Sequence, residues 1–114
     1  MIFEFWIDPN DQSRLEEYLL AATELRALVP AIDGFAGIER FQSVTQPGKF
    51  VAIGFFRDED AVTAWRNNDH HRRVQALGRE RLFIGYRLRM AQVTRDYGRD
   101  DRAEAPADSR AFHG

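Results

Sequence analysis

The chain contains no cysteine, and Lys49 is its only lysine although Lys and Arg together number 16. The absence of cysteine excludes disulfide bonds, thiolate catalysis and cysteine-ligated metal sites, and it makes a reducing cytoplasm the expected compartment. No apolar run approaches the roughly 18–20 residues that a membrane helix needs. The apolar N-terminus lacks a basic leader and a small-residue cleavage site, so we expect neither a signal peptide nor a membrane segment.

Length and charge narrow the class of protein further. The 114 residues, of which 44% are hydrophobic and 30% charged, are enough for one globular domain and too few for two. The formal net charge is −2, so no strong overall field attracts nucleic acid or anionic lipid. We therefore expect one domain that acts neither on nucleic acid nor at a membrane.

The beginning of the chain predicts a strand followed by a helix. Apolar residues alternate along residues 1–7, which is the period of a strand. Asp8 followed by Pro9 is typical of a helix start, with Asp8 as the N-cap and Pro9 in the first helical position. Apolar residues then recur at helical spacing over about residues 9–29, which predicts an amphipathic helix that Pro30 stops.

The middle of the chain predicts a β-hairpin. Residues 35–45 and 49–57 have strand character and are joined by the turn-forming segment Gln46-Pro47-Gly48. The second of these strands is apolar on both faces, so both faces must be covered. Helices of the same chain can cover one face, and a second subunit is expected to cover the other. One face carries Phe50, Ala52 and Phe56, and the other carries Val51, Ile53 and Phe55.

The second half of the chain predicts a broken helix, a long strand and a tail. Asp58 is expected to cap a short helix, Asn67-Asn68-Asp69 to break it, and residues 70–82 to form a second helical piece. Residues 83–97 then predict the last strand. Residues 98–114 are polar and aperiodic, so we expect a flexible C-terminal tail.

The predicted order is strand, helix, strand, strand, helix, strand. This order is typical of the ferredoxin-like βαββαβ fold, an α+β architecture in which an antiparallel sheet carries its helices on one face. We expect one such domain over residues 1–97, and the uncovered sheet face predicts a homodimer. Many unrelated functions use this fold, so the function must be argued from particular residues.

The sequence FVAIGFFRDEDAVTAWRNNDHH at residues 50–71 is the most informative stretch. It resembles the third strand, the acidic turn and the Trp- and His-bearing helix of the antibiotic biosynthesis monooxygenase family, and the resemblance covers about residues 1–97. The resemblance implies a dimeric α+β barrel. The family includes cofactor-independent oxygenases of aromatic polyketides, quinol oxygenases, haem-degrading enzymes and proteins of no known activity. The resemblance therefore predicts the fold more specifically than the reaction.

Three side chains near the helix break are candidate catalytic residues. The resemblance implies that Trp65 lines a cleft between the helices and the sheet and contacts the substrate there, although its position also fits a core residue. His70 and His71 lie on either side of the next apolar stripe, where a neutral imidazole can accept a phenolic proton. Either histidine equally fits a surface or capping position at a helix start.

Asn67 and Tyr86 are candidate substrate-binding residues. Asn67 can donate to a substrate oxygen, although Asn-Asn-Asp also fits a turn. Tyr86 and Arg87 point to opposite faces of the last strand, and the apolar residues on the face of Tyr86 predict that it is buried. The excess of arginine over residues 66–89 can attract an anionic phenolate or a carboxylate, or it can form a solvated surface.

Other chemistries have less support. We reject a metal site, because adjacent histidines do not share a helical face and no third ligand stands out. No G-x-G-x-x-G sequence follows a strand, so neither flavin nor nicotinamide is expected. The haem-degrading branch implies an Asn at the end of the first strand and a His ten residues after Trp65, where this chain has Gln75. An RNA-recognition domain is disfavoured by Val51 and Ile53, which stand where stacking or polar contacts would be needed.

These observations predict a cofactor-independent monooxygenase that oxidises a phenolic, quinol or polyketide-like aromatic substrate with molecular oxygen. In this hypothesis Trp65 and either His70 or His71 carry the chemistry, Asn67 and Tyr86 contact the substrate, and no metal or cofactor takes part. The main alternative is a non-catalytic homodimer that binds a small molecule in a vestigial pocket. A haem-binding or haem-degrading protein is less favoured.

Overall fold

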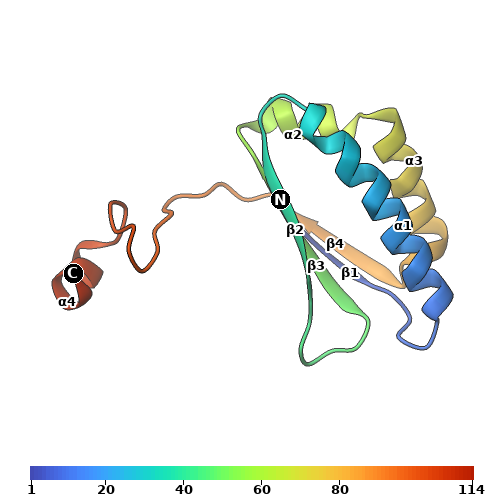
Figure 1. The fold of residues 1–114 in the computed structure, drawn as a ribbon, viewed down its shortest axis with the longest axis horizontal. Coiled ribbons are helices and arrows are strands. Elements are labelled where there is room, and N and C mark those ends of the chain that lie inside the picture. Colours follow the sequence, from blue (N-terminus) through green and yellow to red (C-terminus); the bar gives the residue numbers. More distant parts are fainter.

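The computed structural model describes residues 1–114 and contains a four-stranded antiparallel sheet with helices on one face (Figure 1). The strand order across the sheet is β2-β3-β1-β4. This arrangement confirms the predicted ferredoxin-like α+β fold. No helix combines the length and the apolar character needed to cross a membrane. The elements in chain order are β1 (Ile2–Trp6), α1 (Gln12–Leu28), β2 (Phe35–Gln42), β3 (Lys49–Phe56), α2 (Glu59–Arg66), α3 (Asp69–Leu77), β4 (Gly85–Arg89) and α4 (Ala107–His113).

The hydrophobic core lies between the sheet and the helices and is largely aromatic. Phe5 in the central strand β1 is fully buried, and its ring centroid lies 4.7 Å from that of Tyr18 in α1 and 4.9 Å from that of Phe83. Ala52 of β3 and Leu82 complete the centre of this core. Burial of large aromatic side chains is the main favourable contribution that so small a domain can make to its stability.

The opposite face of the sheet is covered by no helix of the chain (Figure 1). In β3 this face carries Val51, Ile53 and Phe55, because Phe50 packs against the core on the other side. Ile53 lies opposite Ile2 of β1, and 51% of Phe55 is exposed. The structure therefore shows which face of β3 the helices cover and which face they leave uncovered, a choice that the sequence left open. The second subunit expected on this face stays a prediction.

The start of α1 differs from the prediction. Asp11, not Asp8, is the N-cap, and its carboxylate accepts a hydrogen bond from the backbone N–H of Arg14 at 3.1 Å. Asp8 instead accepts from the backbone N–H of Asn10 at 2.9 Å and closes a turn. Pro9 lies in this turn, because its fixed φ suits an early turn position as well as the first position of a helix. The predicted boundary was therefore wrong by nearly one helical turn.

A glycine fixes the β2–β3 hairpin. Gly48 has a φ of +80°, which residues with a side chain rarely adopt, and its carbonyl accepts from the backbone N–H of Ile7 at 2.8 Å. A Cβ at Gly48 would lie 2.2 Å from the carbonyl oxygen of Ile7. The strand β2 ends at Gln42, earlier than predicted, because the hydroxyl of Ser43 accepts from the backbone N–H of Thr45 and begins the turn.

The second helical region is broken at Asn67 and Asn68, as predicted. Asn67 ends α2, and the side-chain oxygen of Asn68 caps α3 by accepting from the backbone N–H of His71 at 3.1 Å. The residues after α3 were predicted to continue the helix, but they form a π-helical turn over Gly78–Leu82. This turn places Leu82 in the core, where it is fully buried.

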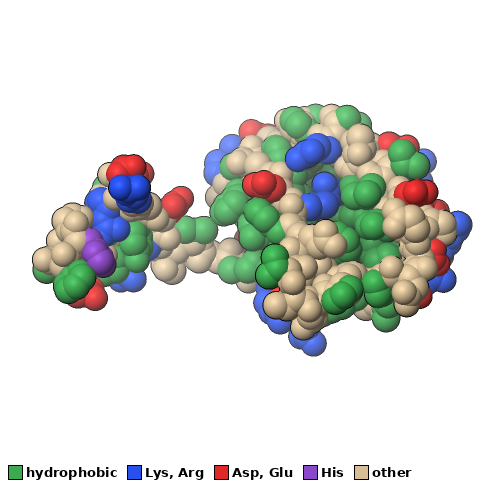
Figure 2. All heavy atoms as spheres, turned by 60° about the horizontal axis from the view of Figure 1, so that its bottom comes forward, with side chains coloured by type: hydrophobic (Ala, Val, Ile, Leu, Met, Phe, Trp, Pro, Cys, Tyr) green, Lys and Arg blue, Asp and Glu red, His purple; other side chains and the backbone are tan.

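The last strand is much shorter than predicted. β4 ends at Arg89, well before residue 97, because it pairs only with β1, whose first residue Ile2 already lies opposite Arg89. The chain then leaves the sheet and ends in α4, which lies away from the domain (Figures 1 and 2). Arg102 organises this segment by donating to the hydroxyl of Ser109 at 2.6 Å. The sequence did not predict the short helix α4, and the flexibility of the tail stays a prediction.

Candidate functional site

A cavity of about 610 Å³ lies between the helices and the inner face of the sheet. Most of its lining is hydrophobic and comes from both layers, including α1, α2, α3, β3 and β4. Figure 2 shows a face of the molecule on which hydrophobic side chains line a hollow, with basic side chains beside it. A cavity of this size and apolar character is typical of small-molecule sites. It lies where the sequence predicted a cleft.

Trp65 and His71 form a stacked pair in the wall of this cavity. Their ring centroids are 4.1 Å apart and the ring planes differ by 18°. Nδ1 of His71 lies 3.0 Å from the carbonyl oxygen of Trp65, and because a carbonyl oxygen only accepts, Nδ1 carries the proton. Trp65 is only 4% exposed. Its indole therefore supports the imidazole and offers little open surface to a substrate.

The electrostatics of His71 suit a base. Burial lowers the pKa of His71 below its usual value of 6.5, although the bond to the Trp65 carbonyl acts in the opposite direction. The neutral imidazole is therefore the form present at physiological pH. With the proton on Nδ1, Nε2 has a free lone pair, and no protein group forms a hydrogen bond with it. His71 thus supplies an unoccupied proton acceptor to the cavity lining.

Sequence reasoning missed Tyr18 and Arg40, which both line the cavity. Nε of Arg40 donates to the hydroxyl oxygen of Tyr18 at 2.7 Å. Burial raises the pKa of Tyr18 above its usual 10.0 despite the nearby guanidinium, so the phenol keeps its proton and can donate it in a hydrogen bond. The sequence signal that could have revealed this pair was the position of Arg40. It lies opposite Ala52 on the inner face of β2, where strand alternation predicts an apolar residue.

Tyr86 of β4 lines the cavity from the side of the sheet. Its ring centroid lies 5.9 Å from that of Phe3. The predicted buried position is wrong, because 46% of Tyr86 and 48% of Leu88 are exposed. The reason is that β4 is an edge strand on which no helix packs closely. Arg87 lies on the other face of the sheet, opposite Glu4 in register.

His70 and Asn67 are not part of the cavity lining. His70 turns toward α1, where its Nε2 lies 3.6 Å from Oε2 of Glu24. The side-chain oxygen of Asn67 accepts a hydrogen bond from Nη2 of Arg72. The cavity therefore brings the other three candidate residues together and leaves these two outside. Adjacent histidines point in different directions from a helix, so only the packing decides which of them faces the cavity.

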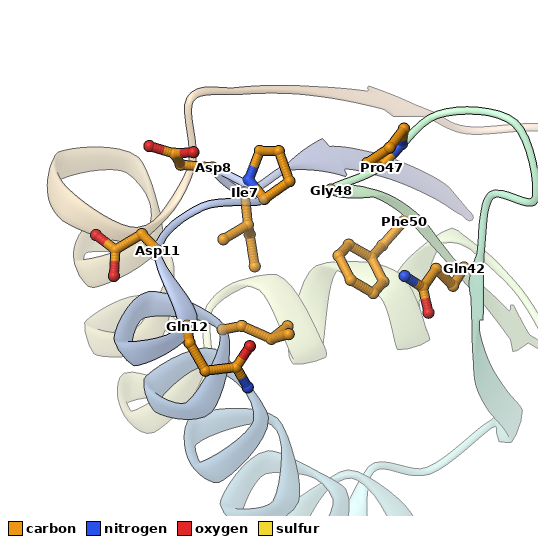
Figure 3. A pocket seen from close by; sticks show the side chains of 10 residues that line it. Ile7, Asp8, Asp11, Gln12, Gln42, Pro47, Gly48 and Phe50 are labelled. Atoms are coloured by element: carbon orange, nitrogen blue, oxygen red, sulfur yellow. The ribbon is translucent and has the colours of Figure 1, made fainter.

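A second pocket of about 250 Å³ lies where β1 joins α1, beside the β2–β3 turn (Figure 3). Asp8 and Asp11 belong to it, but their carboxylates point away from the space between Ile7 and Phe50 (Figure 3). Asp11 is also occupied as the cap of α1. No group of three or more His, Asp or Glu side chains is placed to hold a metal ion. The larger cavity is therefore the candidate site.

Known proteins resemble this chain in sequence and in fold. Residues 1–77 match the family model of antibiotic biosynthesis monooxygenases. A jasmonate monooxygenase of Pyricularia oryzae (strain 70-15) is 36% identical over 94 residues, which make up 82% of this chain and 42% of that protein. The chain thus spans less than half the length of this relative.

Two solved structures illustrate the shared fold. A protein of Pseudomonas aeruginosa is 26% identical with a TM-score of 0.60, over 79% of this chain and 91% of that one. A candidate antibiotic biosynthesis monooxygenase of Nitrosomonas europaea is 13% identical with a TM-score of 0.64, over 75% of this chain and 80% of that one. Both Trp65 and His71 lie within the residues that the family model matches.

Proposed function

The chain belongs to the antibiotic biosynthesis monooxygenase family, and from that premise we propose that it oxidises a phenolic, quinol or polyketide-like aromatic substrate with molecular oxygen and without a cofactor. One observation carries the proposal. The neutral imidazole of His71, held against Trp65, stands in the wall of an apolar cavity of about 610 Å³. Family membership supports monooxygenase activity, and the aromatic and aliphatic lining supports an aromatic substrate.

Proton removal is the step that His71 supplies. A phenol whose hydroxyl meets Nε2 gives its proton to the neutral imidazole, and the resulting phenolate is electron-rich enough to react with oxygen. Holding the ring and the base together in one cavity makes the proton transfer effectively intramolecular. The hydroxyl of Tyr18, held by Arg40 at 2.7 Å, can donate a hydrogen bond to the anion and stabilise it.

The substrate supplies all the electrons in this reaction. A phenol that becomes a quinone loses two hydrogen atoms and gains one oxygen atom, and the second atom of the oxygen molecule leaves as water with those two hydrogens. Oxygen receives all four electrons from the substrate, so the balance requires no separate reductant. For this reason the proposal includes no cofactor.

The fungal relative provides a second candidate substrate. Its name gives jasmonate as the compound on which it acts, and it is 36% identical over 94 residues. That similarity supports testing jasmonate with this chain alongside phenols and quinols, with an added two-electron reductant, because insertion of one oxygen atom into a C–H bond leaves the second atom to be reduced to water. The remaining alternative is a dimer that binds a small molecule without converting it, and the same experiment separates the two.

The experiment is oxygen uptake by the purified chain with hydroquinones, polycyclic phenols and jasmonate, followed by mass spectrometry of products formed under isotope-labelled oxygen. We expect uptake and one labelled atom in the product. His71→Gln should lower the rate by about a hundredfold, as loss of a general base does. His70→Gln changes the neighbouring imidazole outside the cavity and should keep the rate within about twofold. Absence of uptake with every substrate would leave only the non-catalytic binding protein, whereas uptake with equal losses in both variants would show that His71 is not the base.

A further inference from the structure

The candidate cavity contains an unbalanced group of positive charges. Its lining includes arginines from both layers of the fold but no aspartate and no glutamate. One of these arginines, on the sheet, is half-buried, and the other four are exposed, so they remain hydrated and add positive charge beside the cavity. We refer to this set as the cavity arginines: Arg26, Arg40, Arg66, Arg72 and Arg79.

None of the cavity arginines forms an ion pair. Elsewhere in the domain the chain does pair its basic side chains, as where Nη2 of Arg81 lies 3.1 Å from Oε2 of Glu17. Outside the cavity, Arg73 and Arg87 are the only arginines of residues 1–90 without an ion pair. Unpaired arginine in this domain is therefore concentrated around the cavity.

The hydrogen bonds of the cavity arginines also leave their charge uncompensated. Arg66 and Arg72 donate only to neutral side-chain oxygen atoms, and Arg40 donates to the Tyr18 hydroxyl. No side-chain hydrogen bond of Arg26 or Arg79 is present. A neutral acceptor orients a guanidinium without neutralising it, so these groups remain free to pair with an anionic ligand.

Three of the cavity arginines come from one end of the helical layer. Arg26 lies in the last turn of α1, Arg66 in the last turn of α2, and Arg72 near the start of α3. The end of α1, the helix α2 and the start of α3 lie together in Figure 1. Apart from Arg40 of β2, the sheet side of the same cavity has no charged residue, and its lining includes Phe3 and Leu88. The cavity is thus cationic at one end and hydrophobic along its floor.

We propose that the cavity binds an amphiphilic carboxylate, with the carboxylate at the cavity arginines of the helical end and the apolar body along the sheet. This inference rests on the proposed function, because it names the chemical class of that site's substrate, an aromatic or alicyclic acid. A guanidinium pairs with a carboxylate through two parallel N–H···O bonds, which a neutral group of the same shape cannot reproduce in full. Charge therefore selects the substrate and also sets its orientation.

The test compares naphthoate with naphthamide, which have nearly the same shape and differ in charge. Calorimetric titration of the full chain without turnover gives the Kd of each. We expect naphthoate to bind at least about tenfold more tightly. Arg72→Gln should raise the Kd of naphthoate by about tenfold and leave that of naphthamide within about twofold. Arg73→Gln alters the adjacent arginine, which does not line the cavity, and should change neither Kd.

Equal affinities for the two probes, absence of naphthoate binding, or equal weakening by the two substitutions would overturn the proposal. Circular dichroism establishes that both variants are folded before titration. The outcome is separate from that of the oxygen-uptake experiment. Charge selectivity without oxygen uptake would overturn the proposed oxidation and keep this inference, whereas uptake with neutral phenols and no charge selectivity would overturn this inference alone.

Discussion

Nδ1 of His71 donates to the carbonyl oxygen of Trp65 at 3.0 Å, while the two rings stack with centroids 4.1 Å apart. These two contacts fix both the orientation of the imidazole and the nitrogen that carries its proton. The accepting nitrogen, Nε2, is therefore available only while the ring is neutral. The pH dependence of the reaction consequently reports the pKa of His71.

The rate should rise with pH around a midpoint below pH 6.5, the usual pKa of histidine, because burial lowers the pKa of His71. A lowered pKa keeps the imidazole neutral at lower pH, so the rate should level off at a lower pH than a histidine of ordinary pKa would allow. Oxygen uptake measured as kcat/KM from about pH 5 to about pH 8 gives this midpoint. Trp65→Phe keeps the backbone acceptor, which raises the pKa, and replaces the stacked indole with a smaller ring that covers the imidazole less, so the midpoint should move up toward that of free histidine. A wild-type midpoint at or above the usual value would show that His71 is not the base.

Gly48→Ala should destabilise the domain. The left-handed backbone of this turn costs a residue with a side chain roughly 1–2 kcal/mol, and the new Cβ would lie 2.2 Å from the carbonyl oxygen of Ile7. We expect the free energy of unfolding to fall by more than about 2 kcal/mol in a denaturant titration. Gly98→Ala is the control, because its Cβ would meet nothing within 4 Å and its change should stay within about 0.5 kcal/mol. Similar losses in both variants would contradict this account of the hairpin.

Local patterns were sufficient to predict most of the fold. Each of three features can be recognised within a short stretch of sequence: the helical spacing in α1, the two apolar faces of β3 and the break before Asn68. The length of β4 cannot be predicted from local sequence, because it depends on pairing with β1, which lies far away in the chain. Ile2 lies opposite Arg89, so β1 offers nothing with which later residues could pair.

The candidate site was predictable only in part for the same reason. Trp65 was found through the resemblance, but the choice between His70 and His71 depends on how α3 packs. The bond between Tyr18 and Arg40 joins residues 22 positions apart on different elements. A single sequence contains no direct record of such a contact. Only the inward position of Arg40 in an alternating strand pointed toward it.

Removal of residues 98–114 should leave the thermal midpoint of the domain within about 2 °C of the full chain. The side-chain bonds of this segment are largely internal, such as that of Arg102 to the hydroxyl of Ser109 at 2.6 Å. The segment also lies away from the sheet and helices (Figure 1). Thermal unfolding of the truncated and full chains by circular dichroism tests this. A decrease of many degrees would show that the tail packs on the domain or on a second copy.

We propose that a second copy of the chain covers the outer face of the sheet. Val51, Ile53 and Phe55 lie side by side along this face with no helix over them, and water contact with such a patch is unfavourable. Light scattering should therefore give a mass of about twice 13.2 kDa at micromolar concentration. Ile53→Glu places a charge in the proposed contact and should give a monomer, because an unpaired buried carboxylate is costly. Val44→Glu changes a fully exposed residue in the hairpin turn and should leave the dimer intact. A monomeric wild-type protein, or equal dissociation of both variants, would show that this face does not hold a second copy.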